Sequence, residues 1–113
     1  MEPTALLRSY FAAWKAADGE ALVALLAEDV DAAGPLAAVH GAEAHAASLA
    51  RSAVLFQDIV VERSVADGDD VLTWFTLRLQ DGTDVAAANW CRVRDGRIAR
   101  VRVTFDPRPM LPA

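Results

Sequence analysis

The sequence has few of the residues from which cross-linked or metal-bound scaffolds are built. It has one cysteine, Cys91, so it can form neither an internal disulfide nor a cysteine-rich zinc site. No uncharged apolar run approaches the roughly 18 residues that a membrane-spanning helix needs. The residues after Met1 lack the basic and apolar regions of a signal peptide. These absences favour a soluble, cytoplasmic protein.

Positive charge is also scarce. The chain has 11 lysine and arginine residues against 16 aspartate and glutamate residues, a net charge of -5, which argues against nucleic acid or a membrane surface as a partner. Five arginines gather between Arg92 and Arg102, but they alternate with apolar residues, as on the solvent face of a strand. The length suits one domain, 1–113, and 54% hydrophobic residues are enough for a packed core.

The first half of the chain has the apolar spacing of helices. From Thr4 to Trp14, large apolar side chains recur three and four residues apart, which predicts a helix that Asp18-Gly19 ends. A second helix is predicted over Glu20 to Ala27. Gly34-Pro35 interrupts the pattern, and an alanine-rich third helix is predicted over Gly41 to Ala53.

The second half has the alternation of strands. Asp-Gly pairs, which favour tight hairpin turns, separate runs that are rich in β-branched residues. The predicted strands cover 55–66, 71–80, 84–94 and 97–105. Three N-terminal helices followed by an antiparallel meander predict an α+β fold, with the helices packed on one face of the sheet.

Both ends of the chain resemble a known family. The run from Tyr10 to Leu22, YFAAWKAADGEAL, and its continuation over 25–30 resemble the opening of SnoaL-like proteins, and 91–98 and 103–107 resemble their ending. Those proteins belong to the nuclear-transport-factor-like, or cystatin-like, superfamily. The resemblance implies a curved antiparallel sheet wrapped against helices as a cone, an apolar internal pocket and frequent dimers through the sheet. It is weak for activity, because this fold hosts enzymes and non-enzymes alike.

The ketosteroid isomerases of this superfamily use a carboxylate base and two oxyanion donors, a tyrosine and a protonated aspartate. By this resemblance, Tyr10 holds the tyrosine position and Asn89 the position of the second donor, where an amide can still donate a hydrogen bond. The base position falls at Gly34, which has no side chain. Tyr10 and Asn89 are therefore the catalytic candidates, and the usual base is missing.

Other residues are candidates for a displaced base. Asp31 is the nearest carboxylate, although alternation from Gly34 places it outside the pocket. His40, which we expect at the pocket rim, is the second candidate, because histidine titrates near neutral pH. By resemblance, an epoxide hydrolase would need a carboxylate where Val103 stands, and a polyketide cyclase an acid where Asn89 stands.

A metal site would need three or four convergent ligands, and the only histidines, His40 and His45, are far in sequence from Cys91. The chain has no glycine-rich phosphate loop or nucleotide fingerprint. We therefore expect no metal and no cofactor.

Alternation along the late strands predicts the pocket wall. Asn89 and Cys91 share a face that is otherwise apolar, where Cys91 is expected to act as a small buried hydrophobe. A buried amide needs partners, so Asn89 binds either a ligand or a structural neighbour such as Tyr10 or water. The predicted pocket residues are Trp14, Gly34, His40, Cys91, Val101, Val103 and Phe105.

The opposite face of the sheet carries Trp90 and Arg92, which predicts a homodimer through that face. On the last strand, alternation places Ala99 inward and Ile98 outward. The run 71–80 has large residues on both faces, and the pattern leaves open which of them meets the pocket.

Three functions remain open at this point. The first is a protein that binds a small hydrophobic, carbonyl-bearing molecule through Tyr10 and Asn89. The second is an isomerase or a polyketide- or steroid-type cyclase that uses the same two donors, because prearranged donors alone can contribute a few kcal/mol. The third is a dimeric scaffold whose pocket is filled by Trp14 and Phe105. Cavity volume separates the first two functions from the third, because a cavity below about 300 Å³ falls short of the usual ligand range.

Overall fold

The computed structural model describes residues 1–112, which form three helices, six strands and two short 3-10 turns. The helices are α1 (Pro3–Lys15), α2 (Gly19–Leu25) and α3 (Ala42–Ser52). The strands are β1 (Leu26–Ala33), β2 (Ala38–His40), β3 (Phe56–Asp67), β4 (Asp70–Leu79), β5 (Asp84–Arg94) and β6 (Arg97–Phe105). The turns are η1 (Ala53–Leu55) and η2 (Arg108–Met110).

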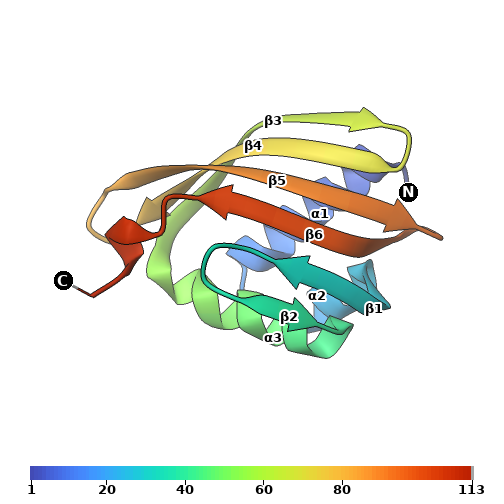
Figure 1. Ribbon diagram of the computed structural model, residues 1–113, viewed down its shortest axis with the longest axis horizontal. Helices are drawn as coiled ribbons and strands as arrows, with labels where there is room; N and C mark the ends of the chain where they lie inside the picture. The colour runs from blue at the N-terminus through green and yellow to red at the C-terminus, as the bar shows by residue number, and fades with distance from the viewer. Residues whose placement is uncertain (113) are drawn as a thin grey trace.

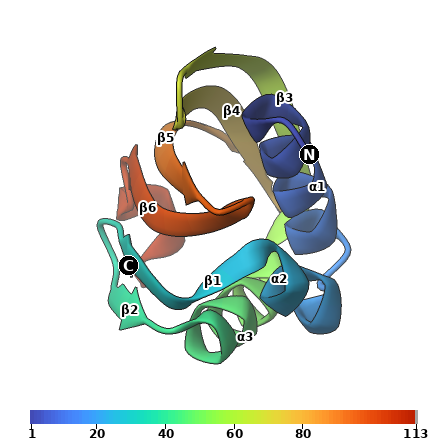
Figure 2. The same ribbon diagram turned by 90° about the vertical axis from the view of Figure 1, so that its right-hand side faces the viewer.

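All six strands belong to one sheet, in the order β2-β1-β6-β5-β4-β3. Every neighbouring pair is antiparallel except β1 and β6, which run parallel. Figure 1 shows the long strands β3 to β6 side by side, and Figure 2 shows the sheet bending around α1, with α2 and α3 on the same side. The sheet therefore has an inner face, covered by the helices, and an outer face.

The α+β class and the three helices on one face of the sheet are confirmed, but the predicted order of elements is wrong. Two strands, β1 and β2, lie between α2 and α3, and the second helix ends at Leu25 instead of Ala27. Leu26 pairs with Ile98 of β6, so its backbone joins the sheet. Val30 and Ala32 are buried on the inner face, in the period of two that a strand requires.

The inner face of β4 forms the centre of the core. Its residues Val71, Phe75 and Leu77 are almost fully buried. The ring of Phe75 lies 4.9 Å from that of Phe11 and 6.1 Å from that of Trp14, both on α1. The opposite face of β4 is the outer one, which answers the question that the sequence left open.

One prediction for β6 is wrong. Ile98, which alternation places outward, is fully buried. The register between β5 and β6 shifts here, because Val93 pairs with Ile98 while Arg92 pairs with Arg100. Ala99 is the extra residue of this bulge, and a bulge turns the side chains on one side of it to the other face of the sheet.

Candidate ligand pocket

The inner face holds a cavity of about 150 Å³ between α1, α3 and strands β1, β5 and β6. Its inner end is lined by buried residues, among them Tyr10 and Asn89. Its mouth is marked by exposed lining residues, Leu36 of the β1–β2 turn and Leu55 of η1, and by the half-buried Met110 of η2. This is the end of the molecule at which the C-terminus lies (Figure 1).

Most of the predicted pocket residues line this cavity. They are Tyr10, Trp14, Gly34, Asn89, Val101, Val103 and Phe105. Two predicted residues do not line it. Cys91 is fully buried two residues beyond Asn89 on β5, and His40 is exposed on β2, the edge strand of the sheet. His40, on the short strand β2, does not line the cavity, whereas His45, on α3, does.

Tyr10 and His45 form the polar centre of the pocket. The Tyr10 hydroxyl lies 2.9 Å from Nε2 of His45, and both side chains are buried. Helix α1 presents Tyr10 on the same face as Leu6 and Trp14, and α3 presents His45 beside the buried Ala42 and Ala46. Two arrangements of the protons satisfy this contact: the hydroxyl donates to Nε2, or Nε2–H donates to the hydroxyl oxygen. Only the second leaves the Tyr10 proton free for a ligand.

Burial keeps both members of this pair neutral. Loss of hydration lowers the pKa of His45 to about 4, because an imidazolium would be enclosed by apolar groups. Burial raises the pKa of Tyr10 well above its usual value, and the nearby Cys91 thiol adds to the rise. At neutral pH the pair is therefore a hydrogen-bonding unit, and a base with so low a pKa is a weak proton acceptor.

Asn89 supplies a second polar group. Its Oδ1 accepts a contact of 2.8 Å from Sγ of Cys91, and burial raises the pKa of that thiol, so it stays protonated. Its Nδ2 donates to no acceptor within residues 1–112. In the same range no side-chain nitrogen or oxygen is both fully enclosed and unpaired. Asn89 is only 3% exposed and is one of the residues that line the pocket, so its amide is a second polar group of the site.

Trp14 is fixed as an aromatic wall. Its Nε1 donates to Oγ of Ser52 at 3.0 Å, and that hydroxyl donates to the Leu49 carbonyl at 2.8 Å. Its ring packs edge-on against Phe56, with centroids 5.8 Å apart. The indole nitrogen is thus used within the fold, so Trp14 offers a ligand only its apolar surface.

Gly34 lies against Val103 across the β1–β6 edge of the pocket. A Cβ placed on Gly34 would lie 2.7 Å from Cγ1 of Val103, closer than side chains pack. The position that the resemblance assigns to a base therefore has no room for a side chain while Val103 is present.

The two candidates for a displaced base lie outside the pocket. Asp31 points to the outer face, as alternation predicts, and its carboxylate pairs with Arg102 at 2.7 Å. The hydrogen bond from Arg102 lowers the pKa of Asp31. His40 is exposed and does not line the cavity. Neither is positioned to take a proton from a molecule held near Tyr10.

His45 is the site residue that the sequence reasoning missed. The signal was its place on α3: Ala42, His45, Ala46 and Leu49 follow the three- and four-residue spacing of one helical face. A histidine on an apolar face needs a polar partner, and Tyr10 is the partner it finds. Within residues 1–112, no three histidine, cysteine or acidic side chains come together as a metal site. No helix in that range is long and apolar enough to cross a membrane.

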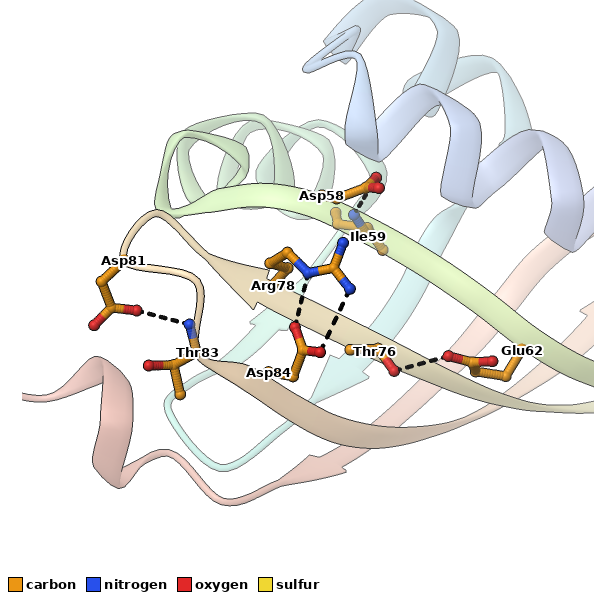
Figure 3. Close-up of polar contacts among 8 residues, drawn as sticks. All are labelled: Asp58, Ile59, Glu62, Thr76, Arg78, Asp81, Thr83 and Asp84. Atoms are coloured by element: carbon orange, nitrogen blue, oxygen red, sulfur yellow. Dashed lines mark hydrogen bonds and ion pairs between the residues drawn. The ribbon is translucent and has the colours of Figure 1, made fainter.

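The outer face of the sheet differs along its length. Figure 3 shows its polar end, where Nε of Arg78 donates to Asp84 at 2.9 Å and Thr76 donates to Glu62 at 3.0 Å. Further along β4, Leu72 and Trp74 are 52% and 53% exposed.

Trp90, which the sequence places among the exposed residues of this face, is partly buried instead. Its Nε1 donates to Asp70 at 2.9 Å, and Asp70 also pairs with Arg92 at 3.3 Å.

The family profile of the SnoaL-like domain matches residues 7–101. Among curated proteins, none matches the chain. An NTF2-like protein of unknown function from Cytophaga hutchinsonii superposes with a TM-score of 0.84 at 22% identity, covering 97% of this chain and 95% of that one. An LEH-like epoxide hydrolase from M. tuberculosis has a TM-score of 0.76 at 24% identity, over 93% and 83% of the two chains.

A protein with a ketosteroid isomerase-like fold from Catenulispora acidiphila, solved in complex with trimethylamine, also superposes. Its TM-score is 0.76 at 20% identity, over 87% of this chain and 82% of that one. At these identities the three likenesses show a shared fold and nothing of a shared activity.

Proposed function

Because the chain belongs to the SnoaL-like domain family, we propose that it binds a small, mostly apolar molecule that carries a carbonyl group. The binding site is the cavity between α1, α3 and the inner face of the sheet. The observation that carries this proposal is the buried Asn89 amide, which lines the cavity and whose one side-chain hydrogen bond within residues 1–112 is accepted by Oδ1, leaving Nδ2 available as a donor. A carbonyl oxygen is the acceptor that such a donor lacks.

The lining of the cavity supports an apolar ligand. Apart from Tyr10, His45, Asn89 and two serines, the lining side chains are aliphatic, aromatic, glycine or proline, with one methionine. One of the serines, Ser52, is already bonded to Trp14 and the Leu49 carbonyl. A few polar groups in an apolar cleft are the usual composition of a small-molecule site.

The test is a binding screen with apolar ketones, flat aromatics and sterols. Thermal shift detects binding first, and calorimetry then measures Kd. We expect a saturable rise in melting temperature with at least one ketone. Asn89→Leu should raise Kd about tenfold, the equivalent of about 1.4 kcal/mol for one lost hydrogen bond. Cys91→Ala is the matched control, because it removes the contact to Oδ1 of Asn89 and leaves Nδ2 in place. Absence of binding across the whole panel would contradict the proposal.

A second function, isomerase or cyclase activity, is favoured by one observation, the contact between Tyr10 and His45. Its test is turnover of any ketone that binds. Tyr10→Phe and His45→Gln would then abolish turnover and leave the ketone bound. The low pKa of His45 and the absence of a carboxylate among the lining residues make ligand binding the better supported proposal.

We also propose that a second copy of the chain covers the apolar part of the outer face of β3 to β5, around Leu72 and Trp74. Val65, Leu72 and Trp90 lie side by side across these strands, and Trp74 is next to them on β4. Val65, Leu72 and Trp74 are each about half exposed, an apolar centre flanked by Asp70–Arg92 ion pairing. A face with an apolar centre and both signs of charge can be self-complementary in a two-fold dimer.

Sedimentation of the protein tests this partner. We expect a dimer that Trp74→Lys converts to a monomer. Thr76→Lys, two residues further along the same face, at its polar end, is the matched control and should remain a dimer. A wild-type protein that stays monomeric at high concentration would contradict this proposal and leave the ligand proposal intact.

A further inference from the structure

The size of the cavity limits what it can hold. Its volume of about 150 Å³ is half the lower end of the roughly 300–1,000 Å³ range of drug-sized sites, so volume alone favours a scaffold over a binding site for a ligand of that size. A dry cavity of about this volume in another protein accommodates benzene. One six-membered ring therefore fits, and the fused rings of a sterol do not. Bulk beyond that ring would have to lie at the mouth, beside Leu36, Leu55 and Met110.

The charge of the cavity limits it further. Within residues 1–112, its lining includes no aspartate, glutamate, lysine or arginine, and Tyr10 and His45 are its only ionisable side chains. Burial shifts the pKa of each in the direction that keeps it neutral. An anionic or cationic ligand would lose its hydration and gain no counter-charge, which is costly in an apolar site. A neutral ligand has no such cost.

Val103, a half-buried residue of β6, lines the cavity beside Asn89. This residue pairs with Asn89 across β5 and β6, so the two side chains are neighbours on the inner face. Its Cγ1 occupies the space that any side chain at position 34 would fill. Valine is stiff at χ1, so it does not swing aside at little cost. The pair of Gly34 and Val103 therefore fixes how much room a ligand has beside the Asn89 amide.

Resting on the proposed function, we infer that the pocket selects neutral molecules that place a single ring and one hydrogen-bond acceptor beside Asn89, and that Val103 sets this size limit. Val103 is thus a specificity-determining residue, and the selected class is that of monocyclic ketones and related neutral carbonyl compounds. Substituents opposite the acceptor leave through the mouth. Rings fused beside the acceptor meet Val103 and Tyr10.

Four probes test this inference by calorimetry at neutral pH. Cyclohexanone and acetophenone place one ring beside the acceptor, benzoate is the anionic counterpart of acetophenone, and fluorenone has fused rings on both sides of its carbonyl. We expect saturable binding of the first two. Benzoate and fluorenone should each bind at least about tenfold more weakly than acetophenone, although fluorenone has more apolar surface to bury.

Val103→Ala supplies the matched variant. It should lower the ratio of the fluorenone Kd to the acetophenone Kd by about tenfold or more. Gly19→Ala, at a position with nothing within 4 Å of an added Cβ and outside the pocket, should not change any affinity. Tighter binding of fluorenone than of acetophenone by the wild type, equal binding of benzoate and acetophenone, or no effect of Val103→Ala would each overturn the inference while leaving a ligand pocket. Failure of all four probes to bind would instead overturn the proposed function itself, and this inference with it.

Discussion

The two faces of the one sheet have opposite chemistry. On the inner face, the polar groups Tyr10, His45 and Asn89 are neutral and buried; Tyr10 and His45 contact each other, and Asn89 accepts from Cys91. On the outer face, polar contacts involve charged side chains that remain in water, such as the ion pair of Asp31 with Arg102. Alternation along each strand separates them, since successive side chains point to opposite faces. The inner face therefore has the properties of a binding site for neutral molecules, and the outer face those of a hydrated or protein-covered surface.

The largest expected effect is a difference in unfolding free energy between two alanine substitutions, one on each face of β4. Phe75→Ala removes a fully buried ring that packs against Phe11 and Trp14, and we expect it to cost about 3–5 kcal/mol of unfolding free energy. Trp74→Ala, at the adjacent but half-exposed position, should cost less than about 1 kcal/mol in dilute, monomeric protein. Urea unfolding measures both, and similar losses for the two would break the comparison.

The next effect concerns pH. The pKa of His45 is about 4 in the folded chain against about 6.5 in an unfolded one. Between these values the unfolded chain binds a proton that the folded chain does not, so stability is highest above about pH 6.5 and falls as the pH drops toward about 4. The loss amounts to about 3 kcal/mol.

Urea unfolding at about pH 7 and about pH 4 measures that loss. His45→Gln should reduce the difference between the two pH values, and His40→Gln, on the exposed strand β2, should retain it. An unchanged difference in His45→Gln would mean that this buried imidazole is not the group responsible.

A smaller effect is expected where the pocket edge is tightest. Gly34→Ala places a methyl group against Cγ1 of Val103, and we expect it to cost about 1–3 kcal/mol from overpacking. Adding Val103→Ala to Gly34→Ala should restore part of the unfolding free energy that Gly34→Ala loses. A double-mutant cycle measures this coupling. Gly19→Ala is the control, since an added Cβ there meets nothing within 4 Å. Simple additivity of the two substitutions would show that the contact is not tight.

The smallest effect should come from the outer face. Asp31→Asn removes the charge that pairs with Arg102, in a contact where both side chains are about a third to a half exposed. Water and salt screen such a pair, so the urea midpoint should move less than it does for Gly34→Ala. The affinity for acetophenone should stay as in the wild type. A loss of that affinity would contradict the conclusion that Asp31 lies outside the binding site.

Local signals in the sequence were sufficient for the strands that hairpins connect. The bounds of β5 and β6 were predicted to the residue, because the Asp-Gly turns at 81–82 and 95–96 and the proline at 107 limit them, and the alternation places Asn89 inward. Long-range contacts were not predictable in this way. The segment Leu26–Ala33 is a strand because it pairs with β6, some 70 residues further along the chain, and the bulge that buries Ile98 depends on the same sheet.

The residues of the candidate site also divide into those that local signals predicted and those that only long-range contacts bring together. Tyr10, Trp14 and Asn89 were found from helix spacing, strand alternation and family resemblance, and all three line the cavity. The partner of Tyr10 was not, because His45 lies 35 residues away and meets it only when α3 packs beside α1. The tight fit of Gly34 against Val103 likewise exists only once β1 and β6 are paired.

The most direct test of a neutral, hydrogen-bonding pocket on the inner face uses the side chain of Asn89, the single asparagine of the chain. Asparagine-specific ¹⁵N labelling gives one side-chain amide signal pair, which reports on Nδ2 alone. We expect both amide proton signals to shift saturably on titration with cyclohexanone, with the Kd that calorimetry gives, and to stay in place on titration with benzoate. An Asn89 amide that is unmoved at saturating cyclohexanone would contradict the account.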